Sequence, residues 1–486
     1  MELNVVSLGR TWLRIVQIVA VLLIAFKFVQ LAFAGVFMDE AYYWMWGQHP
    51  ALSYYDHPPL NAWLLGLSST IFGWNILALR APVGLAFLAD IVALYLMSRR
   101  LCGADWRPHF WLTLLLFLVT PIYWMVTAIA LPDHLLLTTC LFAITFLTGF
   151  FRDRAAGGRG ADRDLHFGAV ALGLAGLAKY NAAFLGVGLV LTIVLYDRAL
   201  LGQLRLYLAV ALTLLLQLPV VIWNATEHFA SWEFILQGRH AGLKASLDGL
   251  PPLLIGILIF VSPFLFWPIV QFALARKNAI PGSGLARVTF LVSSLSIVAI
   301  SFTTLVLFHW NLVAYAAMLP FLAFVMRPRV LIGLQAVFGI AFAVAAFVNY
   351  AVTPLTNVSG WGDEATAWSY GWEPTAQAVA AAETQYGTGF VAAADYTTAS
   401  LLGFALRDRN VTSLSPNRDQ YDYWFDAKAH AGEDAILFGD RWRELSPSIT
   451  SRFKSVTELA VLPVRRFGKS LDTHRIYLAK GFSPNG

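Results

Sequence analysis

The chain has 486 residues, of which 58% are hydrophobic and 13% are charged, with 17 tryptophans and a mean hydropathy of +0.63. Soluble proteins usually carry about a quarter charged residues, so this composition excludes an ordinary soluble protein and predicts a membrane protein that crosses the bilayer many times. The formal net charge is +5, but the basic residues lie in short loops between apolar runs, which excludes a nucleic-acid-binding patch.

The apolar runs predict the membrane-spanning helices. The first run covers residues 11–36, and its length, with Lys27 and Gln30 inside it, favours an uncleaved helix over a signal peptide. Further runs, most of them near the roughly 20 residues that a span needs, bring the expected number of spans to eleven. They lie at residues 75–97, 110–128, 133–151, 166–179, 182–196, 206–223, 251–274, 288–308, 312–326 and 330–350.

The basic residues divide the connecting segments into two sides. With a cytoplasmic amino terminus, the outer side holds only Arg80, Lys179, Arg239 and Lys244. The inner side holds many more, namely Arg10, Arg14, Arg99, Arg100, Arg107, Arg152, Arg154, Arg159, Arg163, Arg198, Arg205, Arg276, Lys277, Arg287, Arg327 and Arg329. Because positive charge concentrates in cytoplasmic loops, we expect residues 37–63 and the carboxy-terminal region outside, which in a bacterium means the periplasm.

An acidic and aromatic stretch, FMDEAYYWMWGQHPALSYYDHPPLNAW at residues 37–63, follows the first span directly. It contains Asp39, Glu40 and Asp56 but no Lys or Arg. A carboxylate beside a bilayer is expensive to desolvate and is by default a functional candidate. The alternative is an aromatic belt with a turn at its two consecutive prolines.

Further outer elements carry polar residues that a lipid-facing helix does not need. Asp133 follows Pro132 at the start of the fourth span, where it is either functional or a helix amino-terminal charge favoured by the dipole. The loop at residues 223–240 mixes His, Glu and Arg with aromatic residues, and an interfacial amphipathic helix is its alternative. His309 lies in a short outer turn that we expect to cap a helix.

The composition changes near residue 351, which predicts a transmembrane domain at residues 1–350 and a second domain at residues 351–486. In the second part the apolar runs shorten to strand length and alternate with a helix-like piece at residues 374–384. The runs at residues 390–394, 411–414, 435–438 and 476–479 predict strands. We therefore expect a mainly α-helical membrane protein with a small carboxy-terminal α/β domain.

Four short motifs together resemble a known family. They are Asp39-Glu40, Asp56-His57-Pro58-Pro59-Leu60, Pro132-Asp133 and Trp223-Asn224. In combination they resemble the GT-C glycosyltransferases, and within these the bacterial relatives of protein O-mannosyltransferases, including the lipid A aminoarabinose and galacturonic acid transferases. The resemblance covers most of the membrane region, and it implies transfer of a sugar from a polyprenyl-phosphate carrier to an acceptor such as lipid A or the lipopolysaccharide core.

The resemblance also implies roles for individual residues. Asp39 matches an aspartate thought to act on the acceptor, Asp133 matches a second important aspartate, and Asp56 matches an acidic metal-binding position. His57 and Tyr42 stand where the aminoarabinose transferases have Lys and Arg. Both departures remove positive charge near the lipid phosphate, which puts the donor sugar and the phosphate contacts in doubt.

The residue types suit this chemistry without the family. A carboxylate, Asp39 with Glu40 beside it, can take the proton of an acceptor hydroxyl. The outer cations Arg80, Lys179 and Arg239 are candidates to bind the donor phosphate, with snorkelling interfacial charges as the alternative. A divalent metal ion could also neutralise the phosphate. The candidate ligands for this metal are Asp56 with His240 or His228.

A transporter or flippase for a polyprenyl-linked sugar is the competing class. It could line a binding cavity with the same carboxylates, but the charged residues lie at outer helix ends rather than at mid-bilayer, and the sequence contains no evident repeat. A structural assembly protein does not account for Asp39, Asp56 and Asp133 together. The sequence therefore favours a transferase.

Overall fold

A computed structural model describes residues 9–235, 246–275, 279–358 and 363–484. The chain divides into two compact units. The first contains residues 1–31, 57–61 and 83–343, and the second contains residues 32–56, 62–82 and 344–486. The second unit therefore combines the carboxy-terminal region with most of the acidic stretch that follows the first span.

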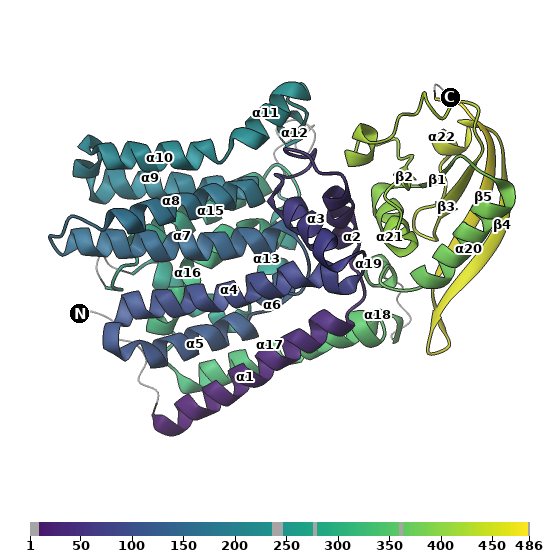
Figure 1. The fold of residues 1–486 in the computed structure, drawn as a ribbon. Coiled ribbons are helices and arrows are strands. Elements are labelled where there is room, and N and C mark those ends of the chain that lie inside the picture. Colours follow the sequence, from purple (N-terminus) through teal and green to yellow (C-terminus); the bar gives the residue numbers. More distant parts are fainter. Residues whose placement is uncertain (1–8, 236–245, 276–278, 359–362, 485–486) are drawn as a thin grey trace. The chain divides into compact units, whose positions relative to one another are not determined.

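The first unit is built from helices (Figure 1). Its long helices α7, α8, α9 and α10 run side by side. The helical elements are α1 (Arg10–Phe33), α4 (Ile76–Cys102), η1 (Gly103–Asp105), α5 (Trp106–Val119), α6 (Pro121–Val126), α7 (Pro132–Ala155), α8 (Asp162–Ala178), η2 (Tyr180–Ala182), α9 (Ala183–Tyr196), η3 (Arg198–Gly202), α10 (Leu204–Leu215), α11 (Leu218–Thr226), α12 (Ala230–Glu233), α13 (Leu250–Phe260), η5 (Pro263–Leu265), α14 (Phe266–Ala273), α15 (Gly284–Ser301), η6 (Phe308–Asn311), α16 (Leu312–Val325) and α17 (Arg329–Phe347).

The number of spans differs from the eleven predicted. In the part of the chain that the structure describes, 6 helices are long and apolar enough to cross a membrane, or up to 8 if each of two bent helix pairs is one span. The bends are 45° between α10 and α11 and 89° between α13 and the helical segment Pro263–Ala273. Some apolar runs fold as shorter helices of 10–17 residues, such as Tyr180–Tyr196.

Close helix packing in the first unit depends on small residues. A Cβ atom on Gly339 of α17 would lie 1.9 Å from the carbonyl oxygen of Val119 at the end of α5. The side chain of Gln335, one turn earlier on α17, donates a hydrogen bond of 2.9 Å to the same carbonyl. Because an unpaired carbonyl is costly in an apolar interior, this contact satisfies the end of α5 where the two backbones meet.

The second unit contains helices and one sheet. Its elements are α2 (Met38–Gln48), most of α3 (Leu60–Phe72), η7 (Val348–Val352), α18 (Leu355–Val358), α19 (Glu364–Ala367), α20 (Trp372–Tyr386), β1 (Phe390–Ala393), α21 (Tyr396–Leu406), β2 (Thr412–Ser413), η8 (Gln420–Tyr423), β3 (Ala435–Gly439), α22 (Pro447–Thr450), β4 (Phe453–Arg466) and β5 (Lys469–Phe482). The predicted α/β domain is confirmed, and the four predicted strand runs correspond to β1, β2, β3 and part of β5.

The sheet has the strand order β2-β1-β3-β5-β4. β1 is parallel to both β2 and β3, whereas β5 is antiparallel to both β3 and β4. Every residue of β1 and of β3 is buried, as expected for parallel strands that are covered on both faces. The ring of Trp372 from α20 lies 5.4 Å from Phe438 on one face, and Leu437 belongs to the apolar core on the other.

Within the second unit, α2 packs against α21. Ala41 of α2, Leu401 of α21 and Trp368 form a buried apolar cluster. α2 also lies close to α3, since a Cβ atom on Gly47 would be 2.7 Å from the backbone nitrogen of Gly66. The helix α2, which carries Asp39 and Glu40 in its first turn, is therefore held by contacts with distant parts of the chain.

Candidate active site

Asp133 and Lys179 form a buried ion pair in the first unit. Asp133 lies in the first turn of α7 behind Pro132, which suits the first helical position because it lacks a backbone N–H. Lys179 follows the last residue of α8, and its Nζ donates to both carboxylate oxygens of Asp133 at 2.8 and 2.7 Å. Each residue is 5% exposed. The pair is thus a desolvated charge centre at the ends of two packed helices.

Two histidines approach the same carboxylate. His57 and His309 both lie within electrostatic range of Asp133, and His57 is itself buried. The segment that carries His57 is anchored by Asn61, whose side chain donates a 3.0 Å hydrogen bond to the Ala130 carbonyl just before α7. His309, which the sequence favoured as a capping residue, therefore belongs to the surroundings of Asp133.

A second buried polar pair, which the sequence reasoning missed, lies next to this centre. A hydrogen bond of 2.9 Å joins a carboxylate oxygen of Asp90 on α4 to Nε2 of His134, the residue after Asp133. Asp90 and His134 are 0% and 2% exposed. An ionisable residue inside a membrane helix costs free energy and is usually functional. The position of Asp90 within an apolar run could therefore have marked it as a candidate site residue.

Glu40 and Arg80 form a buried ion pair in the second unit. Their side chains are 2.8 Å apart, and Glu40 is fully buried. The other Glu40 oxygen accepts a hydrogen bond from the backbone N–H of Phe37, and Arg80 donates to the carbonyl of Gly35. These contacts fix the entry into α2. Glu40 and Arg80, predicted as catalytic and phosphate-binding residues, are bonded to one another.

Asp39 precedes Glu40 in the first turn of α2 and is half-buried. Consecutive helix residues point about 100° apart, so Asp39 faces a different direction from Glu40. It lies within electrostatic range of the Tyr396 phenol at the start of α21. Burial, followed by Asp39 and Asp56, raises the pKa of Tyr396, so this phenol keeps its proton at neutral pH.

Tyr42 connects Asp56 to the carboxy-terminal part of the second unit. Its hydroxyl donates a 2.8 Å hydrogen bond to Asp56 and accepts one of 3.0 Å from the backbone N–H of Gln420. The Gln420 side chain in turn accepts a hydrogen bond of 2.7 Å from the backbone N–H of Tyr55. Burial and then Asp56 raise the pKa of Tyr42, so Tyr42 stays a donor and orients the Asp56 carboxylate.

Not every predicted residue can be placed. Arg239 and His240 lie outside the described residues. Among the residues that the structure describes, no group of three or more His, Cys, Asp or Glu side chains could hold a metal ion. Asp56, which the sequence paired with His240 or His228, accepts a hydrogen bond from Tyr42. The pairing of Asp56 with His240 or His228 therefore stays a prediction.

Comparison with known proteins supports the resemblance seen in the motifs. Residues 56–223 match the family model described as dolichyl-phosphate-mannose-protein mannosyltransferase. The chain is 25% identical over 257 residues to the lipid A galacturonosyltransferase RgtD of Rhizobium johnstonii, a match that covers 50% of each protein. The chain thus spans about half the length of this curated relative.

Solved structures support the fold. The chain is similar to ArnT from Cupriavidus metallidurans in the apo state, with a TM-score of 0.62, 15% identity, and coverage of 96% of this chain and 98% of ArnT. The structure of the same ArnT bound to undecaprenyl phosphate gives a TM-score of 0.60 at 15% identity over the same shares of both chains. The fold predicted from sequence, a helical membrane region with a carboxy-terminal α/β domain, is confirmed.

Proposed function

We propose that this chain, a relative of the dolichyl-phosphate-mannose-protein mannosyltransferases, is a membrane glycosyltransferase that moves a sugar from a polyprenyl-phosphate carrier to a lipid or glycan acceptor such as lipid A. The family model, the similarity to a lipid A galacturonosyltransferase and the fold shared with an undecaprenyl-phosphate-binding protein support the reaction class. The identities of the transferred sugar and of its acceptor are further parts of the proposal.

The buried cluster around Lys179 is the observation that carries this proposal. A polyprenyl phosphate needs a cation near the membrane surface, and a desolvated Lys interacts with phosphate more strongly than an exposed one. Asp133 accepts both hydrogen bonds of Lys179, and His57 and His309 lie near that carboxylate. In this proposal Asp133 orients Lys179, and the three basic side chains bind the donor phosphate.

Asp39 acts in the proposal as the general base. Its carboxylate takes the proton of an acceptor hydroxyl while the oxygen attacks the anomeric carbon of the donor sugar. A new glycosidic C–O bond forms, and the bond from that carbon to the phosphate oxygen breaks with its electron pair. The polyprenyl phosphate leaves with this additional negative charge. Asp39 returns its proton to solvent.

We further propose that the protein lies in the bacterial inner membrane with its amino terminus in the cytoplasm and its carboxy-terminal domain in the periplasm, because positive charge concentrates on the opposite loops. Cysteines would be introduced singly at Ala156 and Asn417, both exposed, in a background without Cys102 and Cys140. In intact spheroplasts an impermeant thiol reagent should label position 417 and not 156. The reverse pattern would overturn the orientation.

The reaction is tested with purified full-length protein and a panel of polyprenyl-phosphate sugars that carry galacturonic acid, aminoarabinose or mannose. Release of the carrier phosphate should depend on both lipid A and the correct donor. Asp39→Asn should bind the donor and release the carrier far more slowly than the wild type. Movement of the intact donor across a vesicle membrane without release of the carrier would instead indicate a transporter.

The role of Arg239, outside the described residues, stays a proposal of its own. Loss of a charge-assisted hydrogen bond typically costs about 1.5–3 kcal/mol, so Arg239→Gln should weaken donor binding by about ten- to a hundredfold if Arg239 contacts the phosphate. Equilibrium binding of undecaprenyl phosphate measures this change. Unaltered affinity would remove Arg239 from the donor site.

A further inference from the structure

The carboxy-terminal sheet has a topological switch point between β1 and β3. From β1 the chain passes through α21 to β2 on one side, and it then returns to β3 on the other side of β1. The two strands are parallel, and Ala393 pairs with Phe438. In open sheets of this kind, ligands bind beyond the carboxyl ends of the strands where the order reverses. Asp395 and Asp440 lie at equivalent positions there, each two residues beyond this pair.

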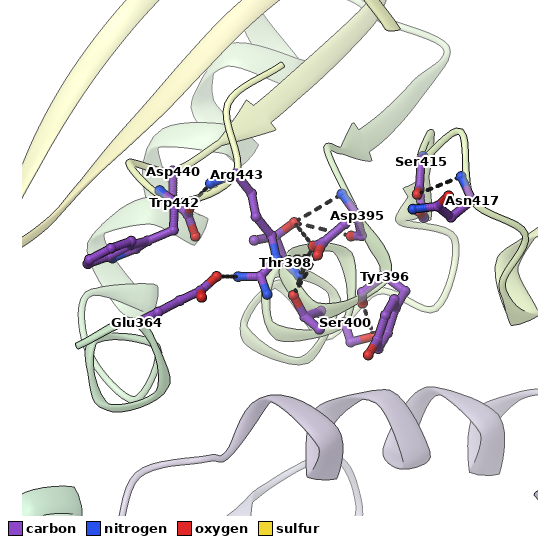
Figure 2. A network of polar contacts seen from close by, with 12 residues as sticks. Glu364, Asp395, Tyr396, Thr398, Ser400, Ser415, Asn417, Asp440, Trp442 and Arg443 are labelled. Carbon is purple, nitrogen blue, oxygen red and sulfur yellow. Dashed lines mark hydrogen bonds and ion pairs between the residues drawn. The ribbon is translucent and has the colours of Figure 1, made fainter. Parts of the chain in front are cut away.

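Polar side chains gather at this end of the sheet (Figure 2). Arg443, which follows β3, forms ion pairs with Asp395 at the start of α21 and with Glu364 of α19, the latter at 2.7 Å. Its guanidinium also lies 4.2 Å from the ring centre of Trp368. The Arg443, Asp395 and Glu364 side chains are 20%, 21% and 40% exposed, so solvent and ligands can reach them.

Tyr396 links this network to the candidate base. It is the first residue of α21, directly after Asp395, and its ring centre lies 4.5 Å from that of Tyr42 on α2. Asp39 and Asp56 are both within electrostatic range of its phenol, as are Asp395 and Arg443. The phenol is half-buried, and its hydroxyl makes no hydrogen bond to any residue that the structure describes.

The charges restrict what can bind here. The carboxylates of Asp39, Asp56 and Asp395 lie within electrostatic range of the Tyr396 phenol, and those of Asp395 and Glu364 form ion pairs with Arg443. An anion such as a phosphate would be repelled by this excess of negative charge. Sugar hydroxyls suit the site, because they can donate to carboxylate oxygens and accept from the phenol, while the aromatic rings pack against the apolar faces of the sugar.

We propose that Tyr396, Asp395, Glu364 and Arg443 form a subsite for the hydroxyl-bearing, uncharged part of the acceptor saccharide, and that Tyr396 positions the reacting hydroxyl beside Asp39. The inference rests on the proposed transferase function and assigns the acceptor's binding site within the second unit. Tyr396 is thereby a positioning residue, and Asp39 remains the group that takes the proton.

The first test uses full-length protein in detergent, with lipid A as the varied acceptor and a saturating donor. Tyr396→Phe keeps the ring that packs on Tyr42 but loses the hydroxyl, so the KM for lipid A should rise about tenfold, and kcat should also fall because the reacting hydroxyl is held less well beside Asp39. Donor affinity should be unaltered. Tyr386→Phe is the matched control, because Tyr386 is exposed and precedes β1, at the opposite end of that strand.

The second test needs no transfer activity. The probe is the glucosamine disaccharide of lipid A without its phosphates and with its fatty acyl chains replaced by N-acetyl groups, so that it is uncharged, and saturation-transfer NMR reports its binding. The wild type should bind the disaccharide, Tyr396→Phe and Glu364→Gln should each bind it more weakly, and inorganic phosphate should not displace it. Glu364→Gln keeps the shape of the side chain, so it still tests the subsite if Tyr396→Phe does not fold.

The outcomes separate this inference from the proposed function. A wild type that transfers sugar to lipid A, with Tyr396→Phe and Glu364→Gln equal to it in KM and in disaccharide binding, would overturn the subsite and leave the function standing. A wild type that binds the disaccharide through Tyr396 yet transfers no sugar would support the subsite and overturn the function. Displacement of the disaccharide by phosphate, or no disaccharide binding at all, would also overturn the subsite.

Discussion

The buried carboxylates of the two units differ in which residue carries the ion pair. In the first, the candidate residue Asp133 is itself bonded through both oxygens to Lys179. In the second, Glu40 takes the ion pair with Arg80, and the candidate base is its neighbour Asp39. A carboxylate bonded twice to an ammonium group is poorly suited to accept a proton, because protonation would leave the buried cation without its counter-charge. In the proposed function, Asp133 therefore belongs to donor binding, and Asp39 takes the proton.

The strongest test of this division is Asp39→Asn. The amide keeps the shape of the side chain but cannot take a proton, so turnover should fall by about a hundred- to ten-thousandfold, as is typical for loss of a general base. Carrier release with saturating donor and acceptor measures kcat, and undecaprenyl-phosphate binding shows that the donor site is intact. Near-normal turnover would exclude Asp39 as the base and return Asp133 to consideration.

Glu40→Gln should affect stability more than chemistry. It leaves Arg80 buried without its carboxylate, and breaking a buried pair in this way typically costs about 3–5 kcal/mol. The Tm of the purified protein, followed by tryptophan fluorescence, should fall clearly, whereas activity per folded molecule should fall far less than in Asp39→Asn. The double variant Glu40→Gln, Arg80→Met should recover part of the Tm, because the unpaired charge is gone. A Tm equal to the wild type in Glu40→Gln would contradict the structural role.

Lys179→Met tests whether the first unit binds the donor phosphate through Lys179. Loss of a charge-assisted contact typically costs about 1.5–3 kcal/mol, which corresponds to donor binding about ten- to a hundredfold weaker. Because the same change leaves Asp133 buried and unpaired, the control is Lys179→Met with Asp133→Asn, which restores neutrality and should still bind the donor weakly. Wild-type donor affinity in the double variant would show that Lys179 only neutralises Asp133.

The sheet of the second unit contains a further buried acid whose effect should be smaller and pH-dependent. Burial, and then the nearby Asp472, raises the pKa of Asp440 to about 7. Since the unfolded pKa is near 4, the folded unit holds a proton that the unfolded chain releases, and stability should fall as pH rises from about 5 to 7. The slope is at most about 1.4 kcal/mol per pH unit.

Asp440→Asn should reduce this slope because the amide does not titrate. Its side-chain oxygen can still accept the hydrogen bonds from the backbone N–H groups of Trp442 and Arg443, which keeps the local fold. The measurement is the Tm at pH 5, 6, 7 and 8. Asp419, whose pKa burial also raises to about 7, should retain a slope of the same sign. The exposed Asp426→Asn is the matched control, and an identical pH dependence in Asp440→Asn and the wild type would refute the prediction.

The sequence predicted most of the fold because the signals are local. Apolar runs of strand length marked β1, β2, β3 and part of β5, whereas β4 was missed because exposed polar residues interrupt its apolar ones. The predicted number of spans was too high because it was based on apolar composition alone. Several of the apolar runs contain bends or form short helices. Local composition reports burial along one segment and says little about where a helix bends.

The candidate site was predicted as residues but not as contacts. Asp133 and Lys179 were both singled out, yet their pairing across 46 residues was not. The contact of Gln420 with Tyr42 joins residues 378 positions apart, and no local pattern indicates it. Tyr396 was missed for the same reason, because an aromatic residue at the start of a helix is usually a packing residue.

The discontinuous second unit has a consequence for the order of synthesis. Residues 32–56 and 62–82 leave the ribosome early, but their partners at residues 344–486 follow only after the helices of residues 83–343. At roughly 5–20 residues per second, the acidic stretch waits on the order of tens of seconds before Gln420 and Tyr396 exist to contact it. A nascent chain that stops before residue 390 therefore carries Asp39 without Tyr396 and Gln420, and in the proposed function sugar transfer could begin only after the carboxy-terminal region has been made.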